Sequence, residues 1–323
     1  MPTDRIRPTD AHRMDRQERA IMDATWSYYH DGLNQNQIAE RMGISRASVV
    51  NYLAEARKRD YVRISINPRV FTEHKLADEL TSHFKLKSAS VVAASGTTTE
   101  ERVAKMAAEW LPHLLQPQDR LGVAWGETIF QVADAAPQEH IDDLEVVQLV
   151  GSRPSAKGFA AEICSAVLAR QFGARCVNLH VPLVLSNEAL RAQLLAEPVI
   201  QSQMAAVMNC NKVLFACGTC TSDSHIVKTG LMDAAELASH VANGAVGVIC
   251  GRLINHQGEP VKSESETRMV GVSLDDMKGK ETGLLVGSGE DRVEPILAAI
   301  RGGYVTHLAT CDETAARLLS QPL

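Results

Sequence analysis

Glycines and hydroxyl-bearing side chains recur at the ends of four apolar segments of the sequence. The four stretches are "GVAWGET" (122–128), "VGSRPSAKG" (150–158), "ACGTCTSDSH" (216–225) and "VGSGEDR" (286–292). Each glycine lets a small ligand approach the main chain, and each stretch adds a hydroxyl that can donate or accept a hydrogen bond. These hydroxyls belong to Thr128, Ser152, Thr219 and Ser288. One such loop could equally be a plain turn, but four together favour a pocket for a polar ligand.

Other reactive side chains give weaker signals. Cys217 and Cys220 have CxxC spacing, but no second pair follows at the distance of a zinc ribbon. None of the glycine-containing stretches ends in the GK[ST] sequence of a P-loop. His180 and His307 lie inside apolar segments, as core histidines do, whereas His225 lies in a polar loop and is the better ligand contact. Without a catalytic triad or a pair of carboxylates, the sequence favours a binding protein that needs no cofactor or metal.

An alternation of strands and helices from about residue 88 must position these four stretches. Segments rich in Val and Leu predict strands at 88–94, 120–125, 144–150, 176–185, 212–218, 245–254, 269–274, 282–288 and 304–310. The segments between them predict helices at 99–115, 158–172, 188–209 and 290–301. This alternation indicates an α/β domain with a parallel sheet covered on both faces. Ligands bind at the carboxyl ends of such strands, so the four stretches are expected to meet at one edge.

The segment before this domain has the pattern of an all-α helix-turn-helix. Residues 15–31 predict a first helix with an inward stripe made of Ile21, Ala24, Thr25 and Tyr28. Asn34 and Gln37 have the spacing of a capping box at the start of a second helix. Gly43 then supplies a tight turn, and Ser45 caps a third helix. A helix, a glycine turn and a further helix are the parts of this DNA-binding motif.

The outer face of the third helix carries side chains expected of a DNA reader. Val49 and Leu53 point inward, which leaves small and hydrogen-bonding residues to enter the major groove. Basic residues follow and can contact phosphates. The predicted DNA contacts are Ser45, Arg46, Ala47, Ser48, Asn51, Arg57 and Arg63. "DYVRISI" (60–66) predicts the strand of a wing, and the alternative interpretation is a helical hairpin that contacts another protein.

Charge, apolar runs and cysteine content narrow the class of protein. The formal net charge is −6, but residues 1–70 hold 12 Lys and Arg against 9 Asp and Glu, and the remainder holds 21 against 30. A modestly basic segment on an acidic body suits a DNA reader with a second, non-DNA-binding domain. No apolar run is long enough for a membrane span, and the N-terminus lacks the pattern of a signal peptide. Seven scattered cysteines are typical of reduced thiols, so we expect a cytoplasmic location.

These patterns predict four parts of the chain. They are a flexible N-terminal tail at 1–14, a winged helix-turn-helix domain at 15–66, a linker and connecting helix at 67–87, and an effector-binding and oligomerisation domain at 88–323. Pro68, in "INPRVF" (66–71), marks the linker.

Several of these motifs together resemble the SorC family of bacterial transcription regulators. The resemblance rests on the helix-turn-helix and on "WGET" (125–128), "VGVICGRLINHQG" (246–258), "VGVSLDDMKG" (270–279) and "AIRGGYVTHLATCDETAARLL" (299–319). It implies a winged DNA-binding head joined to a Rossmann-like domain similar to sugar-phosphate isomerases of the NagB/RpiA type. It also implies a tetramer whose affinity for operator DNA changes when a sugar, polyol or sugar phosphate binds.

The resemblance also implies which residues bind the effector. They are Gly126, Glu127, Thr128, Gly151, Ser152, Gly218, Thr219, Arg252, Asn255 and Arg292. Two positions depart from the family pattern. Asn255 stands where the family usually has an acidic residue, and Glu127 puts a carboxylate in a loop expected to hold a phosphate. Glu127 favours a neutral polyol or free sugar, although Arg292 could still hold a phosphate.

The leading interpretation is therefore an effector-responsive repressor or other DNA-binding regulator of a carbohydrate or polyol catabolic operon. Its expected partners are double-stranded operator DNA, a small sugar or polyol, and further copies of itself, but no membrane. An alternative is an isomerase-like enzyme with a DNA-binding appendage, in which Glu127 or His225 could serve as the general base. A third interpretation is a DNA-binding assembly module whose pocket is vestigial.

Overall fold

The computed structural model describes residues 16–59, 61–62, 68–153 and 159–322. The chain forms two compact units, Met1–Asn67 and Pro68–Leu323, which we call the head and the body. Each is described by itself. None of the helices in the described ranges combines the length and apolar character that a membrane span requires.

The described part of the head contains three helices, and capping interactions fix the ends of the second and third. They are α1 (Arg16–Tyr29), α2 (Gln35–Met42) and α3 (Arg46–Lys58). The expected capping box is present, because Asn34 Oδ1 accepts from the Gln37 amide at 3.1 Å and Gln37 Oε1 accepts from the Asn34 amide at 2.9 Å. Gly43 adopts a φ of 63° after α2, and Ser45 Oγ accepts from the Ser48 amide at 3.1 Å.

The core of the head is small. Its buried apolar cluster consists of Ala24, Ile38, Val49 and Leu53. The inward position predicted for Tyr28 is wrong, because this side chain is 37% exposed and Ser27 is buried instead. The chain folds back at this point, with the Leu33 amide donating to the Ser27 carbonyl at 3.0 Å, and only a small side chain fits beneath it. The predicted N-terminal tail lies outside the described residues, as does most of the predicted wing strand.

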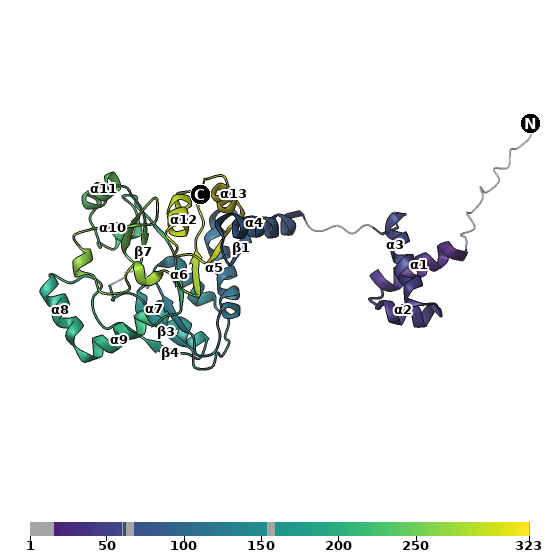
Figure 1. Ribbon diagram of the computed structural model, residues 1–323, viewed down its shortest axis with the longest axis horizontal. Coiled ribbons are helices and arrows are strands. Elements are labelled where there is room, and N and C mark those ends of the chain that lie inside the picture. Colours follow the sequence, from purple (N-terminus) through teal and green to yellow (C-terminus); the bar gives the residue numbers. More distant parts are fainter. Residues whose placement is uncertain (1–15, 60, 63–67, 154–158, 323) are drawn as a thin grey trace, which may run out of the picture. The chain divides into compact units, whose positions relative to one another are not determined.

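The body is built on a seven-stranded sheet in which every neighbouring pair is parallel, as predicted (Figure 1). In spatial order its strands are β1 (Ser88–Val92), β11 (His307–Cys311), β10 (Thr282–Val286), β5 (Lys212–Phe215), β2 (Arg120–Val123), β3 (Glu145–Gln148) and β4 (Arg175–Val177). The first and last of the body's strands in sequence, β1 and β11, lie side by side, and Ser88 pairs with His307.

Helices of the body pack against its strands or against one another and enclose a large apolar core. They are α4 (Pro68–Phe84), α5 (Thr99–Trp110), α6 (Glu127–Ala135), α7 (Ala161–Gln171), α8 (Glu188–Ala196), α9 (Pro198–Met208), α10 (His225–Lys228), α11 (Ala234–Ala242), α12 (Val293–Arg301) and α13 (Asp312–Leu319). Short 3-10 turns are η1 (Gly96–Thr98), η2 (Leu111–Leu114), η3 (Glu266–Arg268), η4 (Asp275–Met277) and η5 (Glu290–Arg292). Helix α4, which begins the body, packs against β1 and α13.

A second, antiparallel sheet corrects one sequence prediction. Its strands, in spatial order, are β6 (Gly218–Thr219), β7 (Ala245–Ile249), β8 (Arg252–Asn255) and β9 (Pro260–Val261). The segment 245–254 was predicted as one strand, but the chain reverses at Cys250 and Gly251, whose φ angles are 51° and 81°. Positive φ angles at two successive residues make a tight hairpin, so the segment supplies two antiparallel strands.

Three further predictions are wrong in detail. The segment 176–185 forms only β4 at its start, and 269–274 forms no strand of the large sheet. Isolated bridges instead join these two segments to each other and to the loop after β3. The predicted helix 188–209 is two helices, because Pro198 lacks an amide hydrogen and occupies the first position of α9.

Candidate functional site

A cavity of about 1020 Å³ opens at the carboxyl ends of β2, β5 and β10, which are adjacent strands at the centre of the large sheet. Six of the ten residues expected to bind the effector line it, namely Gly126, Glu127, Thr128, Gly218, Thr219 and Arg292. They come from three of the four stretches of glycine and hydroxyl residues. The parallel sheet brings these stretches together because their strands end at the same edge.

The start of α6 forms one wall of the cavity. Gly126 precedes the helix with a φ of 109°, a conformation that favours glycine, and no side chain caps the first turn. The first amides of an uncapped helix lack partners within the helix and are available to an acceptor. Glu127 and Thr128, the first two helical residues, line the cavity beside these amides. This wall can therefore donate from its main chain and accept through the Glu127 carboxylate.

The opposite wall comes from the segment that follows β5. The Thr219 and Thr221 hydroxyl oxygens lie 3.2 Å apart, and the Thr221 hydroxyl donates to Asp223 Oδ1 at 2.8 Å. This hydrogen bond lowers the pKa of Asp223, which therefore stays ionised. Ser224 is buried, and its hydroxyl has no hydrogen-bond partner among the described residues.

Arg292 reaches into the cavity from η5. Its Nη1 donates to the Cys217 carbonyl at 3.0 Å, and its Nε lies 3.5 Å from Asp291 Oδ2. Lys228 is the second cation of the lining, and its Nζ lies 3.8 Å from Asp223 Oδ2. Both positive charges therefore lie near carboxylates of the protein itself. Glu127 forms no ion pair with any residue that the structure describes.

His225 adds a polarisable ring to the cavity. Burial lowers the pKa of His225, and the negative charge of Glu127 partly opposes this shift. The imidazole is therefore neutral at neutral pH, and one nitrogen can donate while the other accepts. The ring meets Trp125 edge-on, with centroids 6.1 Å apart. Burial also raises the pKa of both cavity-lining thiols, Cys217 and Cys250, to about 12, which makes them poor nucleophiles.

Four of the predicted effector residues lie outside the lining. The Gly151 amide donates to the Val270 carbonyl, and the Ser152 amide to the Val181 carbonyl, so this loop packs against its neighbours. The other two are Arg252 and Asn255. Arg252 is 8% exposed, with Nε donating to the Val272 carbonyl and Nη1 paired with Glu266. Asn255 Oδ1 accepts from two amides within the turn between β8 and β9.

Sequence reasoning missed several lining residues. They include Trp125, Phe159, Thr221, Asp223, Ser224 and Lys228. Most lie in stretches already singled out for their glycines, so their signal was present but could not be separated from that of ordinary turn residues. In the described part of the chain no group of three metal-ligating side chains gathers, at the CxxC pair or elsewhere.

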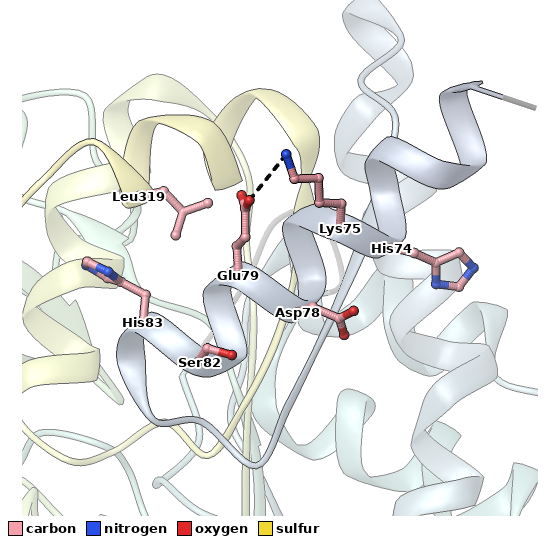
Figure 2. A pocket seen from close by; sticks show the side chains of 7 residues that line it. All are labelled: His74, Lys75, Asp78, Glu79, Ser82, His83 and Leu319. Atoms are coloured by element: carbon pink, nitrogen blue, oxygen red, sulfur yellow. Dashed lines mark ion pairs between the residues drawn. The ribbon is translucent and has the colours of Figure 1, made fainter.

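A second hollow, of about 700 Å³, lies along α4 and the end of α13 (Figure 2). Its lining is His74, Lys75, Asp78, Glu79, Ser82, His83 and Leu319. Lys75 and Glu79 pair across one turn of α4 at 3.5 Å, and Figure 2 shows His74 pointing away from them. None of these residues lies at a strand end, so the central cavity is the better ligand site.

The predicted DNA contacts lie on or next to α3. Arg46, Ala47, Asn51 and Arg57 are exposed. Ser48 is half-buried, and its hydroxyl lies 2.9 Å from that of Ser45, so both serines help to hold the helix start. Arg46 Nε donates to Gln35 Oε1 at 3.2 Å, which links α3 to α2. Arg63 lies outside the described residues.

Comparisons with known proteins agree with this arrangement. The model of a family described as "Putative sugar-binding domain" matches residues 68–320. The chain is 32% identical to "Uncharacterized transcriptional regulator YjhU" of Escherichia coli K12 over 93% of this chain and 94% of that one. It is 28% identical to the "Deoxyribonucleoside regulator" of Bacillus subtilis over 95% and 99% of the two chains.

Solved structures share the fold, one of them over nearly the whole chain. The full-length sorbitol operon regulator SorC of Klebsiella pneumoniae superposes with a TM-score of 0.74 at 22% identity, covering 94% of this chain and 98% of that one. A DeoR family transcriptional regulator of Listeria monocytogenes gives 0.71 at 21% identity, covering 76% and 99%. The curated relatives are transcriptional regulators rather than enzymes. The chain belongs to the SorC/DeoR family of transcriptional regulators, and its body is their sugar-binding domain.

Proposed function

We propose that this regulator binds operator DNA through α3 and that a small uncharged sugar or polyol in the central cavity changes its affinity for that DNA. The observation that carries the proposal is the cavity itself, which joins an uncapped helix start, several hydroxyls and an unpaired carboxylate at the ends of three central strands. The names of two similar proteins refer to deoxyribonucleosides and to sorbitol, which are uncharged compounds that carry hydroxyls. The regulated genes would then serve carbohydrate or polyol catabolism.

The charges of the described lining favour a neutral ligand over a phosphate. Glu127, Asp223 and Asp291 are acidic, and the two cations, Lys228 and Arg292, already lie near Asp223 and Asp291. His225 is neutral because burial lowers its pKa. A phosphate would bring its negative charge next to Glu127, which costs free energy in a partly buried site. A polyol instead offers hydroxyls that donate to Glu127 and accept from the amides of α6.

The proposed regulator acts as a homo-oligomer. One head presents one short recognition helix, and specific binding usually needs two half-sites on the same face of the duplex. The resemblance to the SorC family favours a tetramer that represses. Coupling requires that the effector favour one arrangement of the oligomer over another, typically by about 1–3 kcal/mol.

Calorimetry and operator footprinting on the full chain test the proposal. A panel of tetritols, pentitols, hexitols, free sugars and their phosphates is titrated against the protein. We expect uncharged members to bind and to change the footprint, and Glu127→Gln to weaken their binding about tenfold by removing a charged acceptor. Glu264→Gln, an exposed acid away from the cavity, is the matched control and should change nothing.

Two outcomes contradict the proposal at different levels. If only phosphorylated compounds bind, and Glu127→Gln tightens them, the uncharged effector is wrong while sugar-dependent regulation stands. If no compound binds, and Thr128→Ala leaves operator binding and release unchanged, the cavity is not the effector site.

A further inference from the structure

Helix α9 has an outer face without any charged side chain. Its sequence, "PVIQSQMAAVM", contains no Asp, Glu, Lys or Arg, although 22% of the chain is charged. The exposed positions are Pro198, Val199, Gln201, Ser202, Ala205 and Met208. Val199 is 61% exposed and Met208 is 46% exposed. A solvent-facing helix normally carries charged residues on its outer side, so this face has the composition of the centre of an interface.

The packing of α9 within the body does not account for this composition. Ile200 and Val207 are buried on the inner side of the helix. Ile200 joins a small apolar cluster with Leu179, Val181, Leu185 and Val270, against which Met204 also packs. The inner face therefore holds α9 in place, and the outer face would lose nothing within one chain if its residues were charged.

Helix α8 extends the uncharged surface. Figure 1 shows α8 and α9 next to each other at the rim of the body. The exposed positions of α8 after its first residue are Ala189, Leu190, Ala192, Gln193 and Ala196. Arg191, the one cation of α8, is directed to the Met269 carbonyl, to which its Nε donates at 2.7 Å. Within residues 188–208 the acidic side chains are Glu188 and Glu197, which lie at the starts of the two helices.

We infer that the outer face of α9 is where a second copy of this chain docks, helix against helix about a twofold axis. This inference deepens, and rests on, the proposed homo-oligomeric regulator. Residues 71–323 hold 30 acidic against 21 basic side chains, so two bodies carry net charge of the same sign. A face without charge can meet a copy of itself without bringing like charges together, and a twofold contact uses the same patch on both chains.

The order of residues along α9 suits such a contact. When two copies lie antiparallel about an axis between Ser202 and Ala205, each Ser202 faces the other copy's Ala205. Val199 then faces Met208 of the other copy. Small residues at the centre let the helix axes approach closely, and the larger apolar residues at both ends pack against each other. Each facing pair therefore occurs twice across the axis, with small residues paired at the centre and larger apolar residues paired at each end.

The first experiment measures the mass of the full-length protein in solution by sedimentation. In the double variant Val199→Glu, Met208→Glu, carboxylates would face each other twice across the axis. We expect self-association to weaken about 100-fold or more, so that the mass falls by half at concentrations where the unaltered protein is fully assembled. Val241→Glu, which adds a charge at a 42% exposed apolar position on α11, is the control and should keep the mass.

The second experiment adds a thiol to the face. Ser202→Cys treated with a short bismaleimide should give covalent dimers well above the background from native cysteines, whereas Ser239→Cys on α11 should not. Unchanged circular dichroism shows that each variant is folded. The inference is overturned if the double variant keeps the unaltered mass or if Ser202→Cys cross-links no more than Ser239→Cys. Effector-dependent operator binding by the unaltered protein, measured alongside, shows whether the proposed function stands on its own.

Discussion

The head and the body reach a folded state by different means. Four buried apolar residues form the core cluster of the head, and its helix ends are fixed by contacts between residues two to five positions apart. The body has a large apolar core around a seven-stranded sheet, with one smaller cluster besides, and its strand pairs join segments far apart in sequence. The stability of the head therefore depends on a few individual side chains, whereas that of the body is spread over many.

The largest expected effect comes from Leu53→Ala in the head. Leu53 is 4% exposed and belongs to the four-residue cluster, so its truncation should cost about 2–5 kcal/mol of folding free energy. That loss is a large fraction of what a small unit can have. We expect the head to melt and operator binding to vanish, while the body keeps its calorimetric transition and its effector binding.

The matched control is Met22→Ala, which removes an apolar side chain of similar size from a 44% exposed position on α1. This substitution should change the free energy of unfolding of the head by no more than about 0.5 kcal/mol. If Leu53→Ala lowered the transition of the body as much as that of the head, the two units would not be energetically separate and the comparison would break.

A smaller effect is expected on the reading face. Asn51 is exposed and its side chain has no hydrogen-bond partner among the described residues, so Asn51→Ala should not alter folding. It should weaken operator binding by about 1–3 kcal/mol if the amide contacts a base edge. Arg57→Ala should instead weaken binding to every DNA sequence alike and reduce the salt dependence. Gel shifts at two salt concentrations distinguish the two, and unchanged binding in both variants would exclude α3 as the DNA reader.

The smallest expected effect belongs to the body and depends on pH. Burial foremost, and then the charges of Lys87 and Lys212, lower the pKa of His307 from 6.5 to about 4. Between pH 6.5 and about 4 the unfolded chain takes up a proton that the folded body does not, so stability falls as the pH falls. We expect the free energy of unfolding of the body to fall by on the order of 1–2 kcal/mol between pH 7 and pH 4.

Denaturant unfolding of the body at pH 7 and pH 4 measures this loss. His307→Asn should remove the His307 share of it, while the weaker, same-direction contribution of His225 remains. An equal loss in the variant and the unaltered protein would show that other groups cause the pH dependence.

The same comparison explains which parts of the fold were predictable. Every helix of the head followed from neighbouring residues, such as the Asn34–Gln37 box and the glycine at 43, because the interactions that form it are local. The parallel sheet and most of its strands also followed from apolar segments between helices. Tyr28 was misplaced because a chain reversal, which helical periodicity does not encode, decided which residue faced inward.

The errors in the body come from contacts between distant segments. The segment 245–254 is mostly apolar, and Gly251 and Arg252 near its end did not by themselves show that Cys250 would take a positive φ and divide it. The pairing of Val150 with Gly271 and of Ser152 with Pro182 likewise depends on segments that meet only in the folded body.

In the candidate site, too, some residues were predictable from the sequence and others depended on contacts between distant segments. The stretches at 122–128 and 216–225 reached the cavity because they follow adjacent central strands. Gly151 and Ser152 form a glycine and hydroxyl pair like those of the other stretches. A Cβ at Gly151 would lie 2.7 Å from the Leu183 backbone, so this glycine serves close packing within the chain. Glycine at a strand end marks a close approach, and sequence alone does not tell whether a ligand or the chain itself makes it.

The pairing of β1 with β11 also has a consequence for how the protein is made. Among the described strands of the large sheet β1 has β11 as its sole neighbour, and the ribosome produces β11 long after β1. The core cluster of the head joins residues 24 to 53 and can form during translation, whereas β1 must wait with an unpaired edge. A message truncated before residue 307 would therefore yield a folded DNA reader on an unfinished body, a product for chaperones and proteases to remove.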